Sequence, residues 1–199
     1  MAPIQSQDDR DIAVVLQHDF GVRYWDVAIV GDGSGCGWDI GCGWACTLID
    51  AQTKRRKTFH GAWSCGTVNI GEAMPYLHAA SWFAAKYGKE RKAQRSSRLQ
   101  VHCITDSQVT AKLGTTVQRQ TDGWDRVVRK FPHWYMLLGL RDNGFDFHFH
   151  WKPRMVLGLN ALADHMAGAA RKTIEDLPSW QSAAGVPVSG YSFNYQSPE

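Results

Sequence analysis

Residues 23–35 read RYWDVAIVGDGSG, and the interpretation of the fold starts from this stretch. The run from Arg23 to Val30 is rich in β-branched and aromatic residues, which favours a strand. The cluster Gly31-Asp32-Gly33-Ser34-Gly35 follows, and we expect its glycines to end the strand and begin a turn. Asp32 is thereby predicted to close the first strand.

Two further β-rich runs indicate the next strands. They cover residues 43–49 and 56–63, so we expect the first three strands to form an antiparallel meander. The pattern then changes to helical spacing in a segment that is expected to end near Gly88. A fourth strand, residues 99–106, is predicted to end at Asp106.

The second half of the chain adds one strand and two helices. Apolar residues recur at helical spacing over residues 124–138, although Pro132 should break or kink this helix. Aromatic and polar residues alternate over residues 145–152, which is the clearest strand pattern in the sequence. A last helix is expected at residues 160–172, with Leu162 on its buried face. The element order β-β-β-α-β-α-β-α predicts an α/β fold with a five-stranded mixed sheet and helices on both faces.

Composition places the chain among globular proteins of one domain. Its 199 residues allow a sizeable core, and 44% hydrophobic and 21% charged residues are ordinary values. The N-terminal residues are polar, and no stretch approaches the roughly 18 continuous apolar residues of a membrane span. Five cysteines without paired spacing favour a reducing compartment. We therefore expect an intracellular monomer, cytoplasmic or associated with nucleic acid, that makes no contact with membranes.

Positive charge gathers in one segment of the sequence. Between Lys86 and Arg98 lie 6 Lys and Arg residues against 1 Glu, whereas the net charge of the chain is only +3. Such a segment can contact phosphate groups, and it can equally be a solvated loop without a partner. The sequence leaves both interpretations open.

Asp32 and Asp106 are the first candidates for chemistry, because both follow predicted strands. They become neighbours if the first and fourth strands are adjacent and parallel. Crowded carboxylates disfavour one another's charged form, and a divalent cation removes that penalty. Oxygen ligands favour Mg²⁺ or Mn²⁺ over Zn²⁺, and two such ions can hydrolyse a phosphodiester. His148 and His150 could also bind a metal, but polar residues on one strand face are the simpler interpretation.

Four short motifs follow one another along the chain. They are Asp32-Gly33-Ser34, Thr67-Val68-Asn69-Ile70-Gly71-Glu72, Thr105-Asp106-Ser107-Gln108 and Asn160-Ala161-Leu162-Ala163-Asp164. One such motif is common by chance, whereas four in order are specific. In this order, and in their predicted secondary structure, they resemble the type 1 ribonuclease H family over about residues 23–172.

The resemblance implies hydrolysis of the RNA strand of an RNA–DNA hybrid, which leaves 5′-phosphate and 3′-hydroxyl ends. It implies that two Mg²⁺ or Mn²⁺ ions are bound by four carboxylates: Asp32, Glu72, Asp106 and Asp164. Discrimination between RNA and DNA would rest on contacts with 2′-hydroxyl groups. Contacts with the nucleic acid are implied for Gly33, Ser34, Thr67, Asn69, Ser107, Gln108 and Asn160.

The sequence departs from the family pattern at three places. The histidine of the loop before the last helix is absent, and Arg154 takes its place; an Arg cannot act as a base, but it can stabilise phosphate charge. Pro75 would remove a hydrogen bond, at about 3 kcal/mol, if its helix began as early as Thr67. We therefore expect a start near Gly71 or a kink. The family's basic protrusion is not evident, and the segment Lys86–Arg98 is a candidate to replace it.

Two other functions stay open at this point. One is a DNA-directed nuclease of the same superfamily, of the resolvase or exonuclease type. The other is a hybrid-binding module whose catalytic site has weakened. In domain terms, we expect an N-terminal extension over residues 1–22, a ribonuclease H-like domain over residues 23–173 and an irregular C-terminal tail over residues 174–199.

Overall fold

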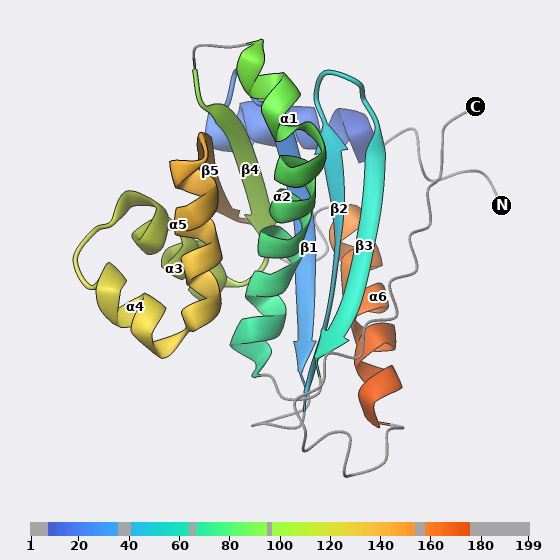
Figure 1. Ribbon diagram of the computed structural model, residues 1–199. Coiled ribbons are helices and arrows are strands. Elements are labelled where there is room, and N and C mark those ends of the chain that lie inside the picture. The colour runs from blue at the N-terminus through green and yellow to red at the C-terminus, as the bar shows by residue number, and fades with distance from the viewer. Residues whose placement is uncertain (1–7, 36–40, 64–66, 95–96, 154–157, 176–199) are drawn as a thin grey trace, which may run out of the picture.

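The computed structural model describes residues 8–35, 41–63, 67–94, 97–153 and 158–175. They form a central sheet with helices on both faces (Figure 1). The strands are β1 (Val27–Gly35), β2 (Cys42–Asp50), β3 (Arg56–Trp63), β4 (Leu99–Thr105) and β5 (Phe145–Trp151). The helices are α1 (Asp8–Phe20), α2 (Val68–Ala93), α3 (Gln108–Arg119), α4 (Trp124–Lys130), the 3₁₀ turn η2 (Pro132–Trp134), α5 (Tyr135–Asp142) and α6 (Gly158–Glu175).

The sheet has the strand order β3-β2-β1-β4-β5. β1 pairs with β2, and β2 with β3, in antiparallel fashion, whereas β4 runs parallel to both β1 and β5. The predicted meander and the predicted mixed five-stranded sheet are therefore confirmed, and the first and fourth strands are adjacent and parallel, as the neighbourhood of Asp32 and Asp106 requires. This topology brings β1 and β4 side by side at the centre of the sheet.

β1 runs through the glycine cluster instead of ending before it. Its alternate glycines face α2: a Cβ on Gly31 would lie 2.6 Å from the Cβ of Pro75, and a Cβ on Gly33 would lie 2.3 Å from the backbone carbon of Gly71. The prediction that these glycines end the strand is wrong, because here they permit close packing rather than a turn. Asp32 accordingly lies inside the strand, opposite Ala45 of β2.

α2 is a continuous helix that contains Pro75. It begins early, since the carbonyl of Thr67 accepts hydrogen bonds from the amides of Ile70 and Gly71 at 3.0 and 3.1 Å. The predicted start near Gly71 is therefore wrong. The predicted end near Gly88 is wrong as well, because α2 continues to Ala93. Gly88 lies within the helix and faces the ring of Phe145.

The segment between β4 and β5 contains more helix than the sequence indicated. The predicted interruption at Pro132 is confirmed, since this residue opens η2 between α4 and α5. α3 was not predicted, because its buried face consists largely of small and polar residues rather than an apolar stripe. Those residues are Thr110, Ala111, Gly114, Val117 and Gln118.

Two apolar cores lie on the two faces of the sheet. The larger core packs α2 and the α3–α5 segment against one face. The smaller core packs α1 and α6 against the other face, with Ile12 and Leu16 of α1 exposed by only 1% and 0%. On α6, Leu159 and Ala163 are buried, whereas Leu162 is 44% exposed. The prediction that Leu162 is buried is thus wrong, because the buried face of α6 passes through Leu159 and Ala163 instead.

Cys42, Cys46 and Cys103 are buried in the described part of the chain. Within the same ranges, no helix combines the length and the apolar character needed to cross a bilayer.

Candidate active site

Three carboxylates from three different elements meet at one place. Asp32 comes from β1, Glu72 from the second turn of α2, and Asp106 directly follows β4. One ligand oxygen from each lies within 4.8 Å of the others. The parallel register ends with Val30 paired with Ile104, and Asp32 and Asp106 each follow this pair by two residues. The pairing of β1 and β4 is therefore what assembles this site.

Tyr76 joins the elements that carry the three carboxylates. Its hydroxyl lies 2.7 Å from the carbonyl oxygen of Gly31 and 2.9 Å from that of Ile104. Gly31 precedes Asp32 on β1, and Tyr76 itself follows Glu72 by one turn of α2. Burial raises the pKa of Tyr76 well above its usual range, and the charges of Glu72 and Asp32 act in the same direction. The hydroxyl therefore stays protonated as a donor.

The turn that carries Asp106 is fixed by the end of β5. The indole nitrogen of Trp151 donates to the carbonyl of Asp106 at 3.0 Å, and the amide of Lys152 donates to the carbonyl of Thr105 at 2.8 Å. The amide of Ser107 donates to Oγ1 of Thr105 at 3.1 Å. On the neighbouring strand, Asp32 is only 2% exposed and its Oδ1 accepts from the amide of Gly33 at 2.8 Å.

The donor set fits a hard divalent cation. All three converging groups are carboxylates, and oxygen ligands suit Mg²⁺ or Mn²⁺ better than Zn²⁺. Three negative charges this close also disfavour one another until a cation neutralises them. A metal ion at this place would be bound by Asp32, Glu72 and Asp106.

The fourth predicted ligand, Asp164, lies on the second turn of α6, half-buried. Within the described ranges it is not a member of the group that converges within 4.8 Å. Asn160, one turn earlier, is 3% exposed, and neither polar atom of its amide has a hydrogen-bond partner among the described residues. Arg154 lies outside the described residues.

The residues predicted to contact nucleic acid lie in the segments that hold the carboxylates. Ser107 caps α3, since its Oγ accepts from the amide of Thr110 at 3.2 Å, and Gln108 is exposed beside it. Of the others, Gly33 is buried against α2, and the half-buried positions are Ser34, Thr67 and Asn69. The role of each in binding stays a prediction.

The histidines of β5 make contacts with a third histidine on β4. Nδ1 of His102 lies 2.8 Å from Nε2 of His150, and the rings of His102 and His148 stack at 4.6 Å. Among the described residues, the carboxylate site is the one group of three metal-binding side chains that converges within 4.8 Å. The histidines thus pair with one another on the face of the sheet, where Phe20 of α1 covers His150 at 4.3 Å.

Two features of the structure had not been predicted. One is Tyr76, whose signal was a hydroxyl between the apolar residues Met74 and Leu77, one turn after an acidic residue. The other is the basic run Lys54–Lys57, which covers the end of the β2–β3 turn and the start of β3 and lines a hollow together with the C-terminal half of α2. Four consecutive cations in the sequence were the available signal.

Comparison with known proteins gives matches by structure alone. No protein-family model matches the chain, and no curated protein matches it by sequence. The N-terminal RNase H domain of a Mycobacterium tuberculosis protein matches with a TM-score of 0.56 and 17% identity, over 80% of this chain and 99% of that one. RNase H1 of the archaeon Halobacterium salinarum matches with a TM-score of 0.52 and 18% identity, over 72% and 96%.

A third similar structure is an RNase H1 solved in complex with an RNA/DNA hybrid. Its TM-score is 0.54 at 14% identity, and the match covers 75% of this chain and 99% of that one. These likenesses agree with the strand order and with the helices on both faces of the sheet. We conclude that this chain has the ribonuclease H-like fold.

Proposed function

We propose that the protein is a metal-dependent endonuclease that hydrolyses the RNA strand of RNA–DNA hybrids. The observation that carries this proposal is the convergence of Asp32, Glu72 and Asp106 within 4.8 Å, from β1, α2 and β4. A carboxylate cluster of this kind is suited to divalent cations that act on phosphodiesters. The similar structure solved with an RNA/DNA hybrid supports the substrate class.

Each part of the site has a proposed role. Asp32, Glu72 and Asp106 bind Mg²⁺ or Mn²⁺, and Tyr76 holds their supporting strands in place. When bound, a pair of such ions activates a water molecule and stabilises the leaving oxygen. Asp164 is the proposed ligand nearer the attacking water, and Arg154 is proposed to stabilise phosphate charge. Contacts with the backbone and with 2′-hydroxyl groups are proposed for Gly33, Ser34, Thr67, Asn69, Ser107, Gln108 and Asn160.

The position of Asp164 favours a second candidate function. Because this carboxylate is not in the converging group, a site with three ligands could bind substrate and metal yet cleave slowly. That protein would be a hybrid-binding module with a weakened active site. It differs from the first candidate in its cleavage rate and not in its binding.

A cleavage assay separates these functions. Labelled RNA–DNA hybrid, duplex RNA and duplex DNA are incubated with the protein in Mg²⁺, in Mn²⁺ and in EDTA. We expect selective cleavage of the hybrid, with 5′-phosphate products, that is lost in EDTA and in Asp106→Asn. Asp142→Asn, an exposed carboxylate on α5, is the control and should cleave normally. Cleavage of duplex DNA instead would support a DNA-directed nuclease, and binding without cleavage in either metal would overturn the proposal.

A further inference from the structure

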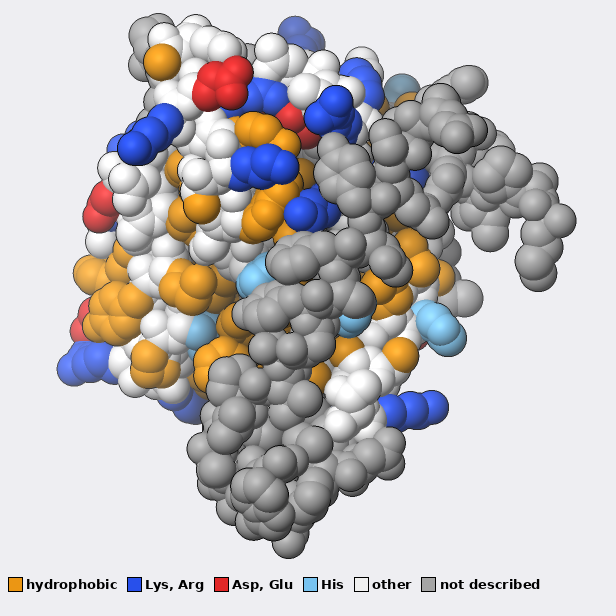
Figure 2. All heavy atoms as spheres, turned by 45° about the vertical axis from the view of Figure 1, so that its right-hand side comes forward, with side chains coloured by type: hydrophobic (Ala, Val, Ile, Leu, Met, Phe, Trp, Pro, Cys, Tyr) orange, Lys and Arg blue, Asp and Glu red, His pale blue; other side chains and the backbone are white. Residues whose placement is uncertain are grey.

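A cationic surface lies along the line where β3 packs beside α2. It is formed by Arg55 and Lys57 from the β2–β3 hairpin and by Trp82, Lys86 and Tyr87 from α2, and we call it the β3–α2 seam. Lys and Arg side chains gather around hydrophobic ones in the upper part of the face seen in Figure 2. The seam therefore joins two basic segments that are about thirty residues apart in the sequence, which Figure 1 shows as the hairpin beside the second half of α2.

The two lysines of the seam share one aromatic ring. The Nζ of Lys57 lies 4.0 Å from the centre of the Trp82 ring, and the Nζ of Lys86 lies 5.2 Å from it. Trp82 is itself held by edge contacts with Phe59 at 5.3 Å and Tyr87 at 5.7 Å. Cations are attracted to the face of an indole ring, so the ring keeps both ammonium groups in place.

Two like charges at one ring disfavour each other. Burial lowers the pKa of Lys57, and the positive charge of Lys86 lowers it further. An anion that contacts both ammonium groups would relieve this repulsion, and a phosphate group offers several acceptor oxygens for that contact. The two lysines are thus arranged for an anion that reaches them from solvent.

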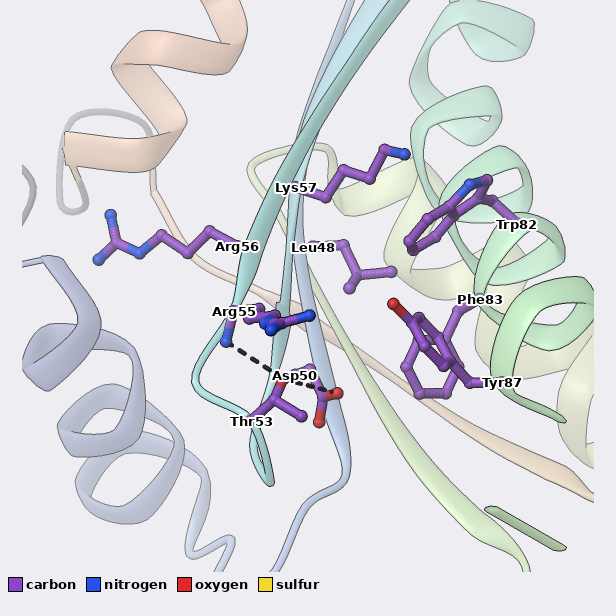
Figure 3. Close-up of a pocket in the computed structure, with 9 residues that line it drawn as sticks. All are labelled: Leu48, Asp50, Thr53, Arg55, Arg56, Lys57, Trp82, Phe83 and Tyr87. Carbon is purple, nitrogen blue, oxygen red and sulfur yellow. Dashed lines mark hydrogen bonds between the residues drawn. The ribbon is translucent and has the colours of Figure 1, made fainter. Parts of the chain in front are cut away.

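The acidic group beside the seam is paired with an arginine. Asp50 is the one carboxylate among the residues that line the hollow at its end (Figure 3). Its Oδ2 lies 2.6 Å from the guanidinium of Arg91, and both side chains are almost fully buried, at 7% and 12% exposure. Asp50 also accepts hydrogen bonds from the amide of Gln52 and the hydroxyl of Thr53. Figure 3 shows Lys57 reaching toward Trp82 from the opposite wall.

The register of the strands gives the spacing between the seam and the carboxylate site. Lys57 pairs with Leu48, which pairs with Ile29, three residues before Asp32 on β1. Strand geometry therefore separates the Cα atoms of Lys57 and Asp32 by about 10 Å along the strands and about 10 Å across two strand spacings. The side chain of Lys57 lies on the α2 face of the sheet, whereas Asp32 points to the other face, because Gly31 and Gly33 on either side of it face α2. A nucleic-acid strand carries one phosphate per about 3.4 Å of its axis, so a strand that contacts both places spans at least about four nucleotides.

We propose that the β3–α2 seam binds the phosphodiester backbone of the nucleic acid away from the carboxylate site, through Lys57 and Lys86 at the Trp82 ring. The inference rests on the proposed function for the class of ligand, and it does not depend on cleavage. The regular spacing of phosphates suits nucleic acid, because one continuous ligand can occupy the carboxylate site and both lysines together.

Binding is measured in the Asp106→Asn background, so that cleavage plays no part. Fluorescence anisotropy gives the Kd of a long hybrid of about 24 base pairs and of a short one of about 6, over a series of salt concentrations. The association constant falls as salt rises, and each lost phosphate contact reduces the steepness of the plot of log K against log salt by about 0.9. Lys57→Gln with Lys86→Gln should lower the slope for the long hybrid by about 2 and weaken binding about tenfold at low salt. Binding of the short hybrid should be weakened less, because fewer of its binding registers reach both the carboxylate site and the seam.

The matched control removes two charges elsewhere, with Lys130→Gln on α4 and Lys172→Gln on α6, both exposed. It should keep the slope and the Kd of the parent. Lys86→Gln alone, at an exposed position, should lower the slope by about 1 and guards against loss of folding. An unchanged slope in the double variant would overturn the inference. Binding to vesicles of anionic lipid is measured in parallel, and a double variant that loses binding to the vesicles but not to the hybrid would overturn it as well. A protein that binds the long hybrid through the seam but cuts nothing overturns the proposed activity alone.

Discussion

The hydroxyl of Tyr76 connects two strands and a helix through a single proton. It donates between the carbonyls of Gly31 and Ile104, at 2.7 and 2.9 Å, from a ring that is fully buried. Since Gly31 precedes Asp32, a small displacement at this hydroxyl is passed to the carboxylate site. The geometry of the three carboxylates therefore depends on a residue that is not one of them.

Tyr76→Phe tests this dependence. Removing the hydroxyl leaves two buried carbonyls without that donor, which should lower the free energy of unfolding by about 1–3 kcal/mol. The affinity for Mg²⁺, followed by isothermal titration calorimetry, should fall as well. Tyr135→Phe, at a position that is 53% exposed, is the control and should change stability by less than about 0.5 kcal/mol. Equal losses in both variants would contradict a special role for Tyr76.

The packing of α2 on β1 decides where Glu72 lies. A Cβ on Gly33 would lie 2.3 Å from the carbon of Gly71 and 2.4 Å from the amide nitrogen of Glu72. Both are backbone atoms, so a side chain at this position cannot be accommodated by a rotamer change. The first turns of the helix would have to move away from the strand.

Gly33→Ala should therefore displace α2 and weaken metal binding. We expect a loss of stability of at least about 1–3 kcal/mol, as for overpacked cores, together with lower hybrid cleavage. Urea unfolding and the cleavage assay measure the two effects. Gly139→Ala on α5 is the matched control: nothing lies within 4 Å of its Cβ position, and it should be neutral or stabilising by about 0.5–1 kcal/mol. A Gly33→Ala protein that cleaves normally would show that the helix can adjust.

The same packing explains which elements could be predicted from the sequence. The strand patterns of residues 56–63 and 145–152 gave nearly the observed bounds, because their alternation is local. The glycines of β1 were interpreted as a turn, since the helix that occupies their empty side lies over thirty residues further along the chain. α3 was missed because its buried face is small and polar. Local patterns predict an element, but its packing partner is not local.

The histidine pairing of β4 and β5 makes stability depend on pH. Burial lowers the pKa of His102 to about 3 and that of His150 to about 4, from 6.5, and the charges of neighbouring histidines add to both effects. The folded state therefore prefers neutral rings. Their contribution is complete above pH 6.5 and is lost as the pH falls toward the folded-state values.

Urea unfolding between pH 7.5 and pH 5 should show this loss. Each such histidine contributes a slope of up to about 1.4 kcal/mol per pH unit below about pH 6. His102→Gln should make the dependence shallower, whereas His165→Gln, at an exposed position of α6, should leave it unchanged. Identical slopes in all three proteins would exclude the pairing as the source, and His133, whose pKa burial lowers to about 4, would then be examined next.

At the scale of the whole molecule, the site depends on the order in which the chain crosses the sheet. The four motifs could be found in the sequence, because each consists of only a few consecutive residues. That Asp32, Glu72 and Asp106 lie within 4.8 Å is a property of topology, which the parallel pairing of β1 with β4 and the position of α2 together produce. The position of Asp164 could not be predicted, since it depends on how α6 is placed on the opposite face.

Three carboxylates so close together should lower the stability of the metal-free fold, and the same three groups should allow it to bind a cation. Without a divalent cation, Asp106→Asn removes one of three mutually repelling charges, so we expect its melting temperature in EDTA to equal or exceed that of the parent. With Mg²⁺, the parent should gain stability by linkage, about 2.7 kcal/mol when the ion is present at one hundred times its Kd, and the variant should gain much less.

Thermal unfolding in EDTA and in a series of Mg²⁺ concentrations measures both effects. Asp122→Asn, an exposed carboxylate before α4, should follow the parent at every concentration. If Asp106→Asn were less stable than the parent in EDTA and gained the same stabilisation from Mg²⁺, the carboxylates would be structural acids and the ion would bind elsewhere. If instead Asp106→Asn is at least as stable as the parent in EDTA and is stabilised less by Mg²⁺, the metal binds where β1, α2 and β4 meet.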